Sequence, residues 1–386
     1  GAYPVPLDGI VGALVLGCIA IRRRSYFPIL ALMSFALFAA GFAAIKLVPT
    51  FALMRTHPRP WESADANTVA MMLRFLFARD QGIYPEGTWG IEGSWEYGAY
   101  IGVIAAALAI VGVARSPRRA LPWVVVCVFC FAVAMGKAGL EFPWIWLHRL
   151  PLMSAERVPS RFLIGVVLGV AILAASGAEL VQQGFGRFCP RVVLLLLVAM
   201  LVDFWSVSAP TLIHAVDGKL EVVPLSPEFR QIFQLAPDRT YPLALANYGS
   251  AVCFNIQEFP TAVVGYNVGR GYPGEQYLKT PGSLTRLKWS PNELSYEVDV
   301  AIPSAVIVNQ NYDSGWRVVE GRGRVYRSGN LLAIEVPAGR QRLTIRNRDP
   351  YLPIGAAVSA LTLLMALWLM RLERRRHRVA QPSVAV

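Results

Sequence analysis

The chain has 386 residues, of which 55% are hydrophobic and only 16% are charged, and its mean hydropathy is +0.44. This composition is too apolar and too poor in charge for an average soluble domain, so it predicts a membrane protein. The formal net charge of +12 could indicate a nucleic-acid partner. Such a partner requires basic residues gathered on one water-facing surface, whereas the large polar segment mixes both signs almost evenly, so no nucleic-acid role is predicted.

Apolar runs along the chain predict about seven transmembrane helices, since about 20 apolar residues are needed to cross the hydrocarbon core. Two runs, 121–136 and 192–206, are short for a span. Lys46 is the one clear ionisable residue that we expect inside a span. The predicted spans lie near residues 5–21, 27–45, 98–114, 121–136, 161–178, 192–206 and 352–370.

Basic residues mark every second junction between these runs, and only Glu179 and Glu373 dilute them. The positive-inside rule places such clusters in the cytoplasm. The net charge is therefore explained mostly by membrane topology. The clusters are Arg22, Arg23 and Arg24, then Arg115, Arg118 and Arg119, then Arg187 and Arg191, and finally Arg371, Arg374, Arg375, Arg376 and Arg378.

The alternation predicts a membrane α-helical fold with an extracytoplasmic, mainly-β domain inserted before the last helix. The outer loops 54–97 and 137–160 are expected on the same side as that domain. The expected domains are a transmembrane helical domain at 1–206, a β-rich domain at 207–351, a last transmembrane helix at 352–372 and a basic cytoplasmic tail at 373–386.

Glycine opens the chain, and neither a signal peptide nor a natural start is visible. We therefore expect a fragment whose N-terminal part lies elsewhere. The five cysteines do not predict a disulfide framework. Cys127 and Cys130 have the spacing of a redox or metal site, but they lie among valines and phenylalanines of a span and are expected to be buried apolar thiols.

In the first outer loop, residues 63–79 have apolar side chains at helical spacing, behind Asp65 or Asn67 as a possible N-cap. This pattern predicts an amphipathic helix that lies on the membrane or over a cavity. Its apolar stripe is Val69, Met72, Leu73, Leu76 and Phe77.

The same loop continues into "PEGTWGIEGSWEYGAYIG", where Glu92 and Glu96 flank Trp95. A tryptophan ring can stack on the apolar face of a sugar while carboxylates accept hydrogen bonds from its hydroxyl groups, so these residues are candidates for sugar or acceptor binding. An aromatic belt with interfacial charges explains the same residues without a ligand.

The second outer loop ends in "MSAERVPSRF", where Arg157 and Arg161 precede an apolar run. A cation at the start of a helix opposes the helix dipole, and a bound anion would relieve this mismatch. If both arginines are helical they share a face, and Pro159 suits a first turn. Snorkelling of the arginines to lipid headgroups is the alternative. The loop also holds Trp144, Trp146, His148 and Arg149.

The third outer segment is irregular from about 207 to 290, with 263–280 as its most distinctive stretch. From 294 onward apolar and polar residues alternate, and glycine-containing turns separate the runs. This pattern predicts a small antiparallel β-sandwich. Its predicted core residues include Trp316, Leu343 and Ile345.

Several of these motifs together resemble the C-terminal part of the bacterial YfhO family, which is grouped with the GT-C glycosyltransferases. The motifs are "RVPSRF" and "EYGAYIG", each opening a span, and "VIVNQNYDSGWRVVEGRG…LLAIEVPAGRQRLTIR" before a last helix. The resemblance covers most of the chain. It implies a multi-pass protein of the bacterial cytoplasmic membrane that takes sugar from a polyprenyl-phosphate donor on the outer face and modifies an envelope glycan acceptor.

The implied chemistry is an inverting displacement in which a carboxylate takes the acceptor proton and cations neutralise the departing lipid phosphate. The family's usual catalytic carboxylate lies in a loop that we expect to be absent here, so the catalytic residue is unknown. We expect Arg157 and Arg161, with Arg149 and His148, to bind the lipid phosphate. Sugar or acceptor binding is expected at Glu96, Trp95 and Glu92.

Three functions compete at this point: glycosyl transfer, a non-catalytic membrane protein that binds glycans or assists polymer export, and a transporter. The transporter ranks last because the spans hold almost no ionisable residue to relay ions. No metal-ligand set is identified, and a divalent cation as cofactor is left open. The expected partners are the lipid bilayer, the polyprenyl-phosphate sugar donor and the glycan acceptor.

Overall fold

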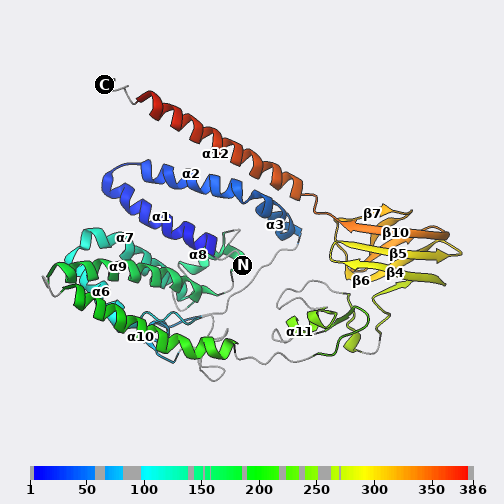
Figure 1. Ribbon diagram of the computed structural model, residues 1–386, viewed down its shortest axis with the longest axis horizontal. Coiled ribbons are helices and arrows are strands. Elements are labelled where there is room, and N and C mark those ends of the chain that lie inside the picture. Colours follow the sequence, from blue (N-terminus) through cyan, green and yellow to red (C-terminus); the bar gives the residue numbers. More distant parts are fainter. Residues whose placement is uncertain are drawn as a thin grey trace. The chain divides into compact units, whose positions relative to one another are not determined.

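A computed structural model describes residues 4–56, 66–80, 97–137, 143–150, 153–156, 158–184, 189–216, 223–233, 240–250, 262–268 and 271–380. The chain divides into two compact units (Figure 1). The helical unit comprises Gly1–Gly41 and Arg59–Gly218, and the mixed unit comprises Phe42–Pro58 and Lys219–Val386. Each unit is described by itself.

The described part of the helical unit consists of helices and short turns (Figure 1). Its α-helices are α1 (Pro4–Arg23), α2 (Phe27–Phe42), α4 (Val69–Phe77), α6 (Gly102–Arg115), α7 (Pro117–Ala134), α8 (Trp144–His148), α9 (Leu163–Gly184) and α10 (Cys189–Val216). Two 3-10 turns, η1 (Met153–Ala155) and η2 (Pro159–Phe162), lie between α8 and α9.

Four helices in the described residues are long and apolar enough to cross a membrane, or up to five when α2 and α3 (Ala44–Thr56) count as one bent span. Several helices could therefore span a membrane, by length and composition. The four are Pro117–Ala134, Pro159–Gln183, Arg191–Pro210 and Leu352–Arg375. The two runs that looked short in the sequence are among them.

The run at 98–114 is instead the short one, because its helix α6 begins only at Gly102 and has 14 residues. Gly102 adopts a positive φ of 70°, a conformation that glycine reaches without the steric cost of a side chain. The prediction of about seven spans therefore stays a prediction.

Helices α6 and α9 approach each other through glycine. A Cβ atom on Gly177 would lie 1.9 Å from the Leu108 carbonyl oxygen, and one on Gly112 would lie 2.3 Å from the Leu173 carbonyl oxygen. Membrane helices commonly pack through small residues, because van der Waals contact between backbones replaces the hydrophobic driving force. These glycines therefore allow α6 and α9 to pack backbone against backbone.

The two cysteines with CxxC spacing pack against α9. Cys130 is fully buried, and its Sγ lies 2.5 Å from the position of a Cβ on Gly165, while Cys127 Sγ lies 2.4 Å from that of Gly169. The thiols fill the space that these glycines leave. Their expected role as buried apolar groups agrees with this packing.

The predicted basic junctions meet in the helical unit. At the end of α1, Arg22 donates from Nη1 to the carbonyl oxygen of Arg118 at 3.2 Å, just after α7 begins. At the other end of α7, the backbone N–H of Asn67 donates to the Met135 carbonyl oxygen at 2.9 Å. We call these the basic end and the loop end. Two of the predicted basic junctions thus lie at the same end of α7, and the membrane topology itself stays a prediction.

The amphipathic helix expected at 63–79 is observed as α4, but its N-cap is neither Asp65 nor Asn67. Thr68 caps it, because its side chain accepts a hydrogen bond from the Met71 N–H. Asn67 is only 1% exposed and instead donates from Nδ2 to the Ala134 carbonyl oxygen at 3.1 Å. Asp65 lies outside the described residues.

The apolar stripe of α4 is partly as predicted. Met72 and Leu76 are buried, together with Phe75, which the predicted stripe omitted, whereas Val69 and Leu73 are exposed. The buried side chains belong to one core cluster with Trp144 and Phe162. Helix α4 therefore covers the loop end of the unit.

The mixed unit contains two four-stranded antiparallel sheets, with strand orders β4-β5-β10-β7 and β3-β6-β9-β8. Helix α12 (Leu352–Ala380) follows them, and a parallel pair of β1 (Arg230–Ile232) and β2 (Tyr248–Ser250), α11 (Thr240–Leu245) and η5 (Tyr266–Val268) precede them. The sheet strands are β3 (Gln276–Leu278), β4 (Gly282–Ser290), β5 (Glu293–Val300), β6 (Ser304–Asn311), β7 (Trp316–Glu320), β8 (Arg324–Ser328), β9 (Leu331–Val336) and β10 (Gly339–Asn347).

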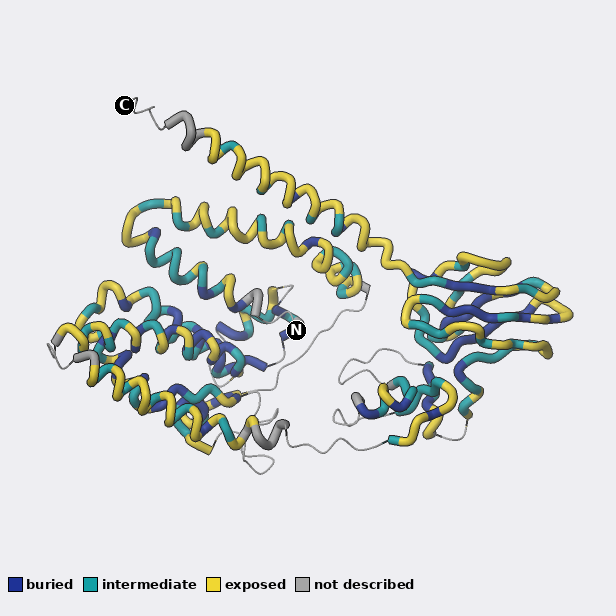
Figure 2. Tube along the Cα trace, viewed as in Figure 1, coloured by how far each residue is buried: buried dark blue, intermediate teal, exposed yellow. Residues whose placement is uncertain are grey.

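Both sheets contribute to one apolar core, shown by the buried strands in Figure 2. The predicted core residues Trp316, Leu343 and Ile345 are at most 1% exposed. In β5, Tyr296 and Val298 are buried as the alternating pattern predicted. The prediction of an antiparallel β region before the last helix is therefore confirmed.

The sandwich begins earlier than the predicted boundary at 294. Strands β3 and β4 belong to the stretch that the sequence left irregular, and each pairs with one strand only, so both are edge strands. Strand β4 has a register shift between Arg286 and Lys288. This bulge breaks the period-2 pattern from which strands are recognised.

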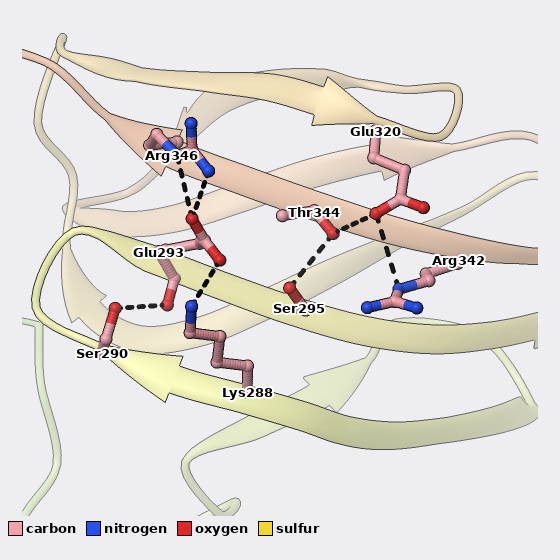
Figure 3. Close-up of polar contacts among 8 residues, drawn as sticks. All are labelled: Lys288, Ser290, Glu293, Ser295, Glu320, Arg342, Thr344 and Arg346. Carbon is pink, nitrogen blue, oxygen red and sulfur yellow. Dashed lines mark hydrogen bonds and ion pairs between the residues drawn. The ribbon is translucent and has the colours of Figure 1, made fainter.

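The outer face of the β4-β5-β10-β7 sheet holds a row of polar contacts (Figure 3). Glu293 accepts hydrogen bonds from Lys288 Nζ at 2.7 Å and from Arg346 Nε at 2.9 Å. Further along, Glu320 Oε2 accepts from Thr344 Oγ1 at 2.7 Å. Cross-strand pairs of this kind stabilise a sheet on its water-facing side.

Helix α12 packs on α3 through small residues. Ser359 Oγ accepts a hydrogen bond from the Ile45 N–H and donates to the Phe42 carbonyl oxygen, each at 3.0 Å. A Cβ on Gly355 would lie 2.5 Å from the Ala44 carbonyl oxygen. Because Ile45 lies in the first turn of α3, Ser359 satisfies a backbone group that the helix itself leaves open.

Candidate functional site

The loop end of the helical unit carries the turn that contains Arg161. Val158 is extended, and Pro159 then opens η2 at its first position, where its missing N–H costs nothing. Ser160 and Phe162 are each 1% exposed, whereas Arg161 is half-buried. The fixed neighbours hold Arg161 at the entry to the 22-residue apolar helix α9.

The loop before this turn packs around Trp144. This side chain is 1% exposed, and its ring lies 5.2 Å from the His148 ring and 6.3 Å from the Phe162 ring, centroid to centroid. The His148 Nε2 atom lies 3.0 Å from the Glu156 carbonyl oxygen. This contact ties α8 to the chain just before Arg157.

Arg149 lies at the surface of the same loop. Its guanidinium carbon is 5.4 Å from the centroid of the exposed Trp146 ring, a cation–π contact. His148 and Arg149 lie in the same loop as Arg161, and their binding of a lipid phosphate stays a prediction. The core cluster of this end joins Trp144 to Phe162, so η2 and α8 belong to one packed region.

Four of the predicted site residues lie outside the described residues: Arg157, Glu92, Trp95 and Glu96. Helix η2 begins at Pro159, after the extended Val158. The shared helical face of Arg157 and Arg161 and the sugar-binding role of the loop at 85–102 therefore stay predictions.

A second polar group at the loop end was missed in the sequence. Asp203, inside the apolar helix α10, forms an ion pair with Arg79 and accepts a hydrogen bond from the Tyr100 hydroxyl at 2.7 Å. Arg79 also donates from Nη2 to Ser206 Oγ at 2.7 Å. The Asp203 side chain is 18% exposed, against 61% for that of Arg79.

Asp203 corrects the statement that Lys46 is the one clear ionisable residue of the spans, because it lies within the predicted span 192–206. Ionisable residues inside membrane helices are costly and commonly functional, so this signal could have been read from the sequence. A Cβ on Gly102 would lie 2.8 Å from Asp203 Oδ2, so glycine leaves room for the carboxylate beside the start of α6. Lys46 itself is exposed on α3.

The chemistry that this end offers is charge recognition. Guanidinium and imidazole groups near a helix start can neutralise an anion, to which the first turn adds its free N–H groups. Within the described ranges, no group of three or more histidine, cysteine, aspartate or glutamate side chains is arranged to hold a metal ion.

Comparisons with protein-family models, curated proteins and solved structures found no match to this chain. The fold alone defines its class: a protein with several helices that could span a membrane and a separate antiparallel β-sheet region before the last helix.

Proposed function

We propose that this chain is part of an integral membrane glycosyltransferase that uses a polyprenyl-phosphate-linked sugar on the outer membrane face to modify an envelope glycan. The observation that carries the proposal is the position of Arg161. A half-buried cation stands at the start of a long apolar helix, where the guanidinium group and the positive end of the helix dipole would together stabilise a bound anion. A lipid phosphate is an anion that lies beside the end of a membrane helix.

The orientation in this proposal rests on the division between the two helix ends. Arg22 and Arg118 meet at the basic end, which the positive-inside rule assigns to the cytoplasm. Arg161, His148 and Arg149 then face the outer side, together with the β-sandwich. In this role Arg161 and its neighbours neutralise the departing lipid phosphate in the transition state.

The second candidate is a non-catalytic membrane protein that binds glycans or assists polymer export. The observation in its favour is the ion pair of Asp203 with Arg79 and its hydrogen bond with Tyr100. A carboxylate engaged in this way is not free to take a proton from an acceptor, and no other carboxylate is assigned as a base.

Substitution of Arg161 separates transfer from simple lipid anchoring. In the full-length protein, reconstituted with undecaprenyl-phosphate-linked hexoses, Arg161→Gln should reduce donor consumption by about 30-fold to 1000-fold, the equivalent of about 2 to 4 kcal/mol in the transition state. Arg161→Lys should restore it only in part, because an ammonium offers a point charge where a guanidinium donates two parallel hydrogen bonds.

The control is Arg74→Gln, which removes an exposed cation of α4 at the same end. It should leave turnover unchanged at matched protein levels. Snorkelling predicts the opposite pattern, in which Arg161→Lys is fully active and Arg161→Gln changes expression rather than turnover. Near-normal turnover in both Arg161 variants would contradict the proposal.

A further inference from the structure

Polar side chains lie on the inner side of the β-sandwich, along the edge formed by β3 and β4. In the strand register Gln276 pairs with Val308, and Arg286 pairs with Tyr296. Paired residues project from the same face of a sheet. Val308 and Tyr296 are both 0% exposed in the core, so Gln276 and Arg286 also project from the inner faces.

Two buried polar atoms at this edge have no hydrogen-bond partner within the described part of the chain. They are the hydroxyl oxygen of Tyr296 and Oε1 of Gln276. Nearly all buried polar atoms in folded proteins are paired, so an unpaired donor and an unpaired acceptor on facing sheets require an explanation. A ligand that both donates and accepts hydrogen bonds would complement them.

Two guanidinium groups lie at the same edge, each over an aromatic ring. The Arg286 guanidinium carbon is 5.3 Å from the centroid of Trp289, and that of Arg230 is 4.2 Å from the centroid of Tyr266. Neither arginine forms an ion pair with a carboxylate among the residues that the structure describes. Within that part of the chain, no ion pair competes with an anion for either positive charge.

A buried carboxylate next to Tyr272 already has hydrogen-bond partners. Glu275 is 6% exposed, and its Oε1 accepts from the Gln231 N–H at 2.6 Å and from the Tyr272 hydroxyl at 2.7 Å. Burial raises the pKa of Tyr272, so it remains a donor. The Tyr272 ring lies 5.5 Å from that of Tyr266, which is 43% exposed. Glu275 therefore holds Tyr272, whose ring contacts Tyr266, and it forms no ion pair with either arginine among the described residues.

We propose that this edge cluster, made of Arg230, Tyr266, Tyr272, Arg286 and Trp289, binds a saccharide that carries a carboxylate or phosphate group. Aromatic rings can stack on the apolar face of a pyranose, and guanidinium groups grip a carboxylate or phosphate through parallel hydrogen bonds. Arg286 pairs with Tyr296 in the strand register, so a movement of Arg286 toward the anionic group would open the Tyr296 hydroxyl to a sugar hydroxyl or to water. The site lies in the mixed unit and does not rest on the proposed transfer reaction.

Calorimetric titration of the purified full-length protein in detergent tests the site with four probes: trigalacturonate, glucose 6-phosphate, maltotriose and inorganic phosphate. At least one of the two acidic saccharides should bind saturably, about tenfold or more tighter than maltotriose and inorganic phosphate. The first two probes distinguish a carboxylate from a phosphate on the sugar. Arg286→Gln and Tyr266→Ala should each weaken this binding about tenfold.

The matched control is Arg322→Gln, which removes an exposed arginine elsewhere on the sandwich and should bind like the parent. Tyr266 is partly exposed, so its substitution keeps the test valid if Arg286→Gln fails to fold. The proposal is overturned if neither acidic saccharide binds, if maltotriose or inorganic phosphate binds equally well, or if Tyr266→Ala retains full affinity. Turnover of the Arg161 variants is a separate readout, so the two proposals can fail independently.

Discussion

At Glu293 two cations meet one carboxylate on the outer face of the sandwich (Figure 3). The hydrogen bond from Lys288, followed by that from Arg346, holds the pKa of Glu293 below its usual range. A carboxylate with a lowered folded-state pKa contributes stability above its unfolded pKa and loses that contribution as pH falls through the folded value. The contribution is therefore present at neutral pH and lost in acid.

The Glu293→Gln variant tests this linkage. Its melting temperature should lie below that of the parent at pH 7, and the difference should shrink below about pH 4, where the parent's carboxylate also loses its charge. The measurement is thermal unfolding of the β-sandwich across pH. Glu335→Gln is the control, because this exposed residue forms no ion pair within the described residues. A difference that stays constant down to pH 3 would refute the linkage.

The position of a candidate site residue was predictable where the residues next to it in the sequence determine that position. Arg161 was recognised because an apolar run follows it directly. The partners of Asp203 could not be predicted, because Arg79 and Tyr100 are 124 and 103 residues away in the sequence. The edge cluster was missed because its members are distant in the sequence: Arg230 and Tyr266, which are in contact, are 36 residues apart.

At the scale of elements, the contact between α6 and α9 depends on Gly177. Replacing it by leucine would place a side chain against the Leu108 carbonyl oxygen, where even a Cβ has only 1.9 Å. The helices must separate or the variant must unfold, at a cost of about 2 kcal/mol or more. The melting temperature of the purified protein in detergent measures this effect. Gly17→Leu is the control, because a Cβ at Gly17 meets no atom within 4 Å. Equal melting of both variants would show that this contact is dispensable.

Most helices and strands were predictable from the hydrophobic pattern of the sequence, and the start of α6 and the strands β3 and β4 were not. Apolar runs gave the α7, α9 and α10 spans, and alternation gave β5 and β10. The late start of α6 depends on the backbone conformation of Gly102, which pattern does not encode. Strands β3 and β4 were not predicted, because β3 has only three residues and β4 contains a register shift.

At the scale of the whole molecule, the predicted membrane topology of both units depends on the positions of the basic residues along the chain. The basic junctions predicted which helix ends share a side, and the contact of Arg22 with Arg118 agrees with it. The extracytoplasmic position that we propose for the sandwich depends on the same rule, because the chain enters α12 at Leu352 and continues to a cluster of arginines. The outer-face chemistry that we propose requires this orientation.

Cysteine labelling in intact cells measures the orientation directly. Ser116→Cys, beside the basic junction, and Ser314→Cys, on the exposed surface of the sandwich, are introduced separately after the native cysteines have been replaced. An impermeant thiol reagent should modify the cysteine at position 314 in intact cells and the cysteine at position 116 only after the membrane is permeabilised. Modification at position 116 in intact cells, with protection at position 314, would contradict the orientation and with it the proposed function.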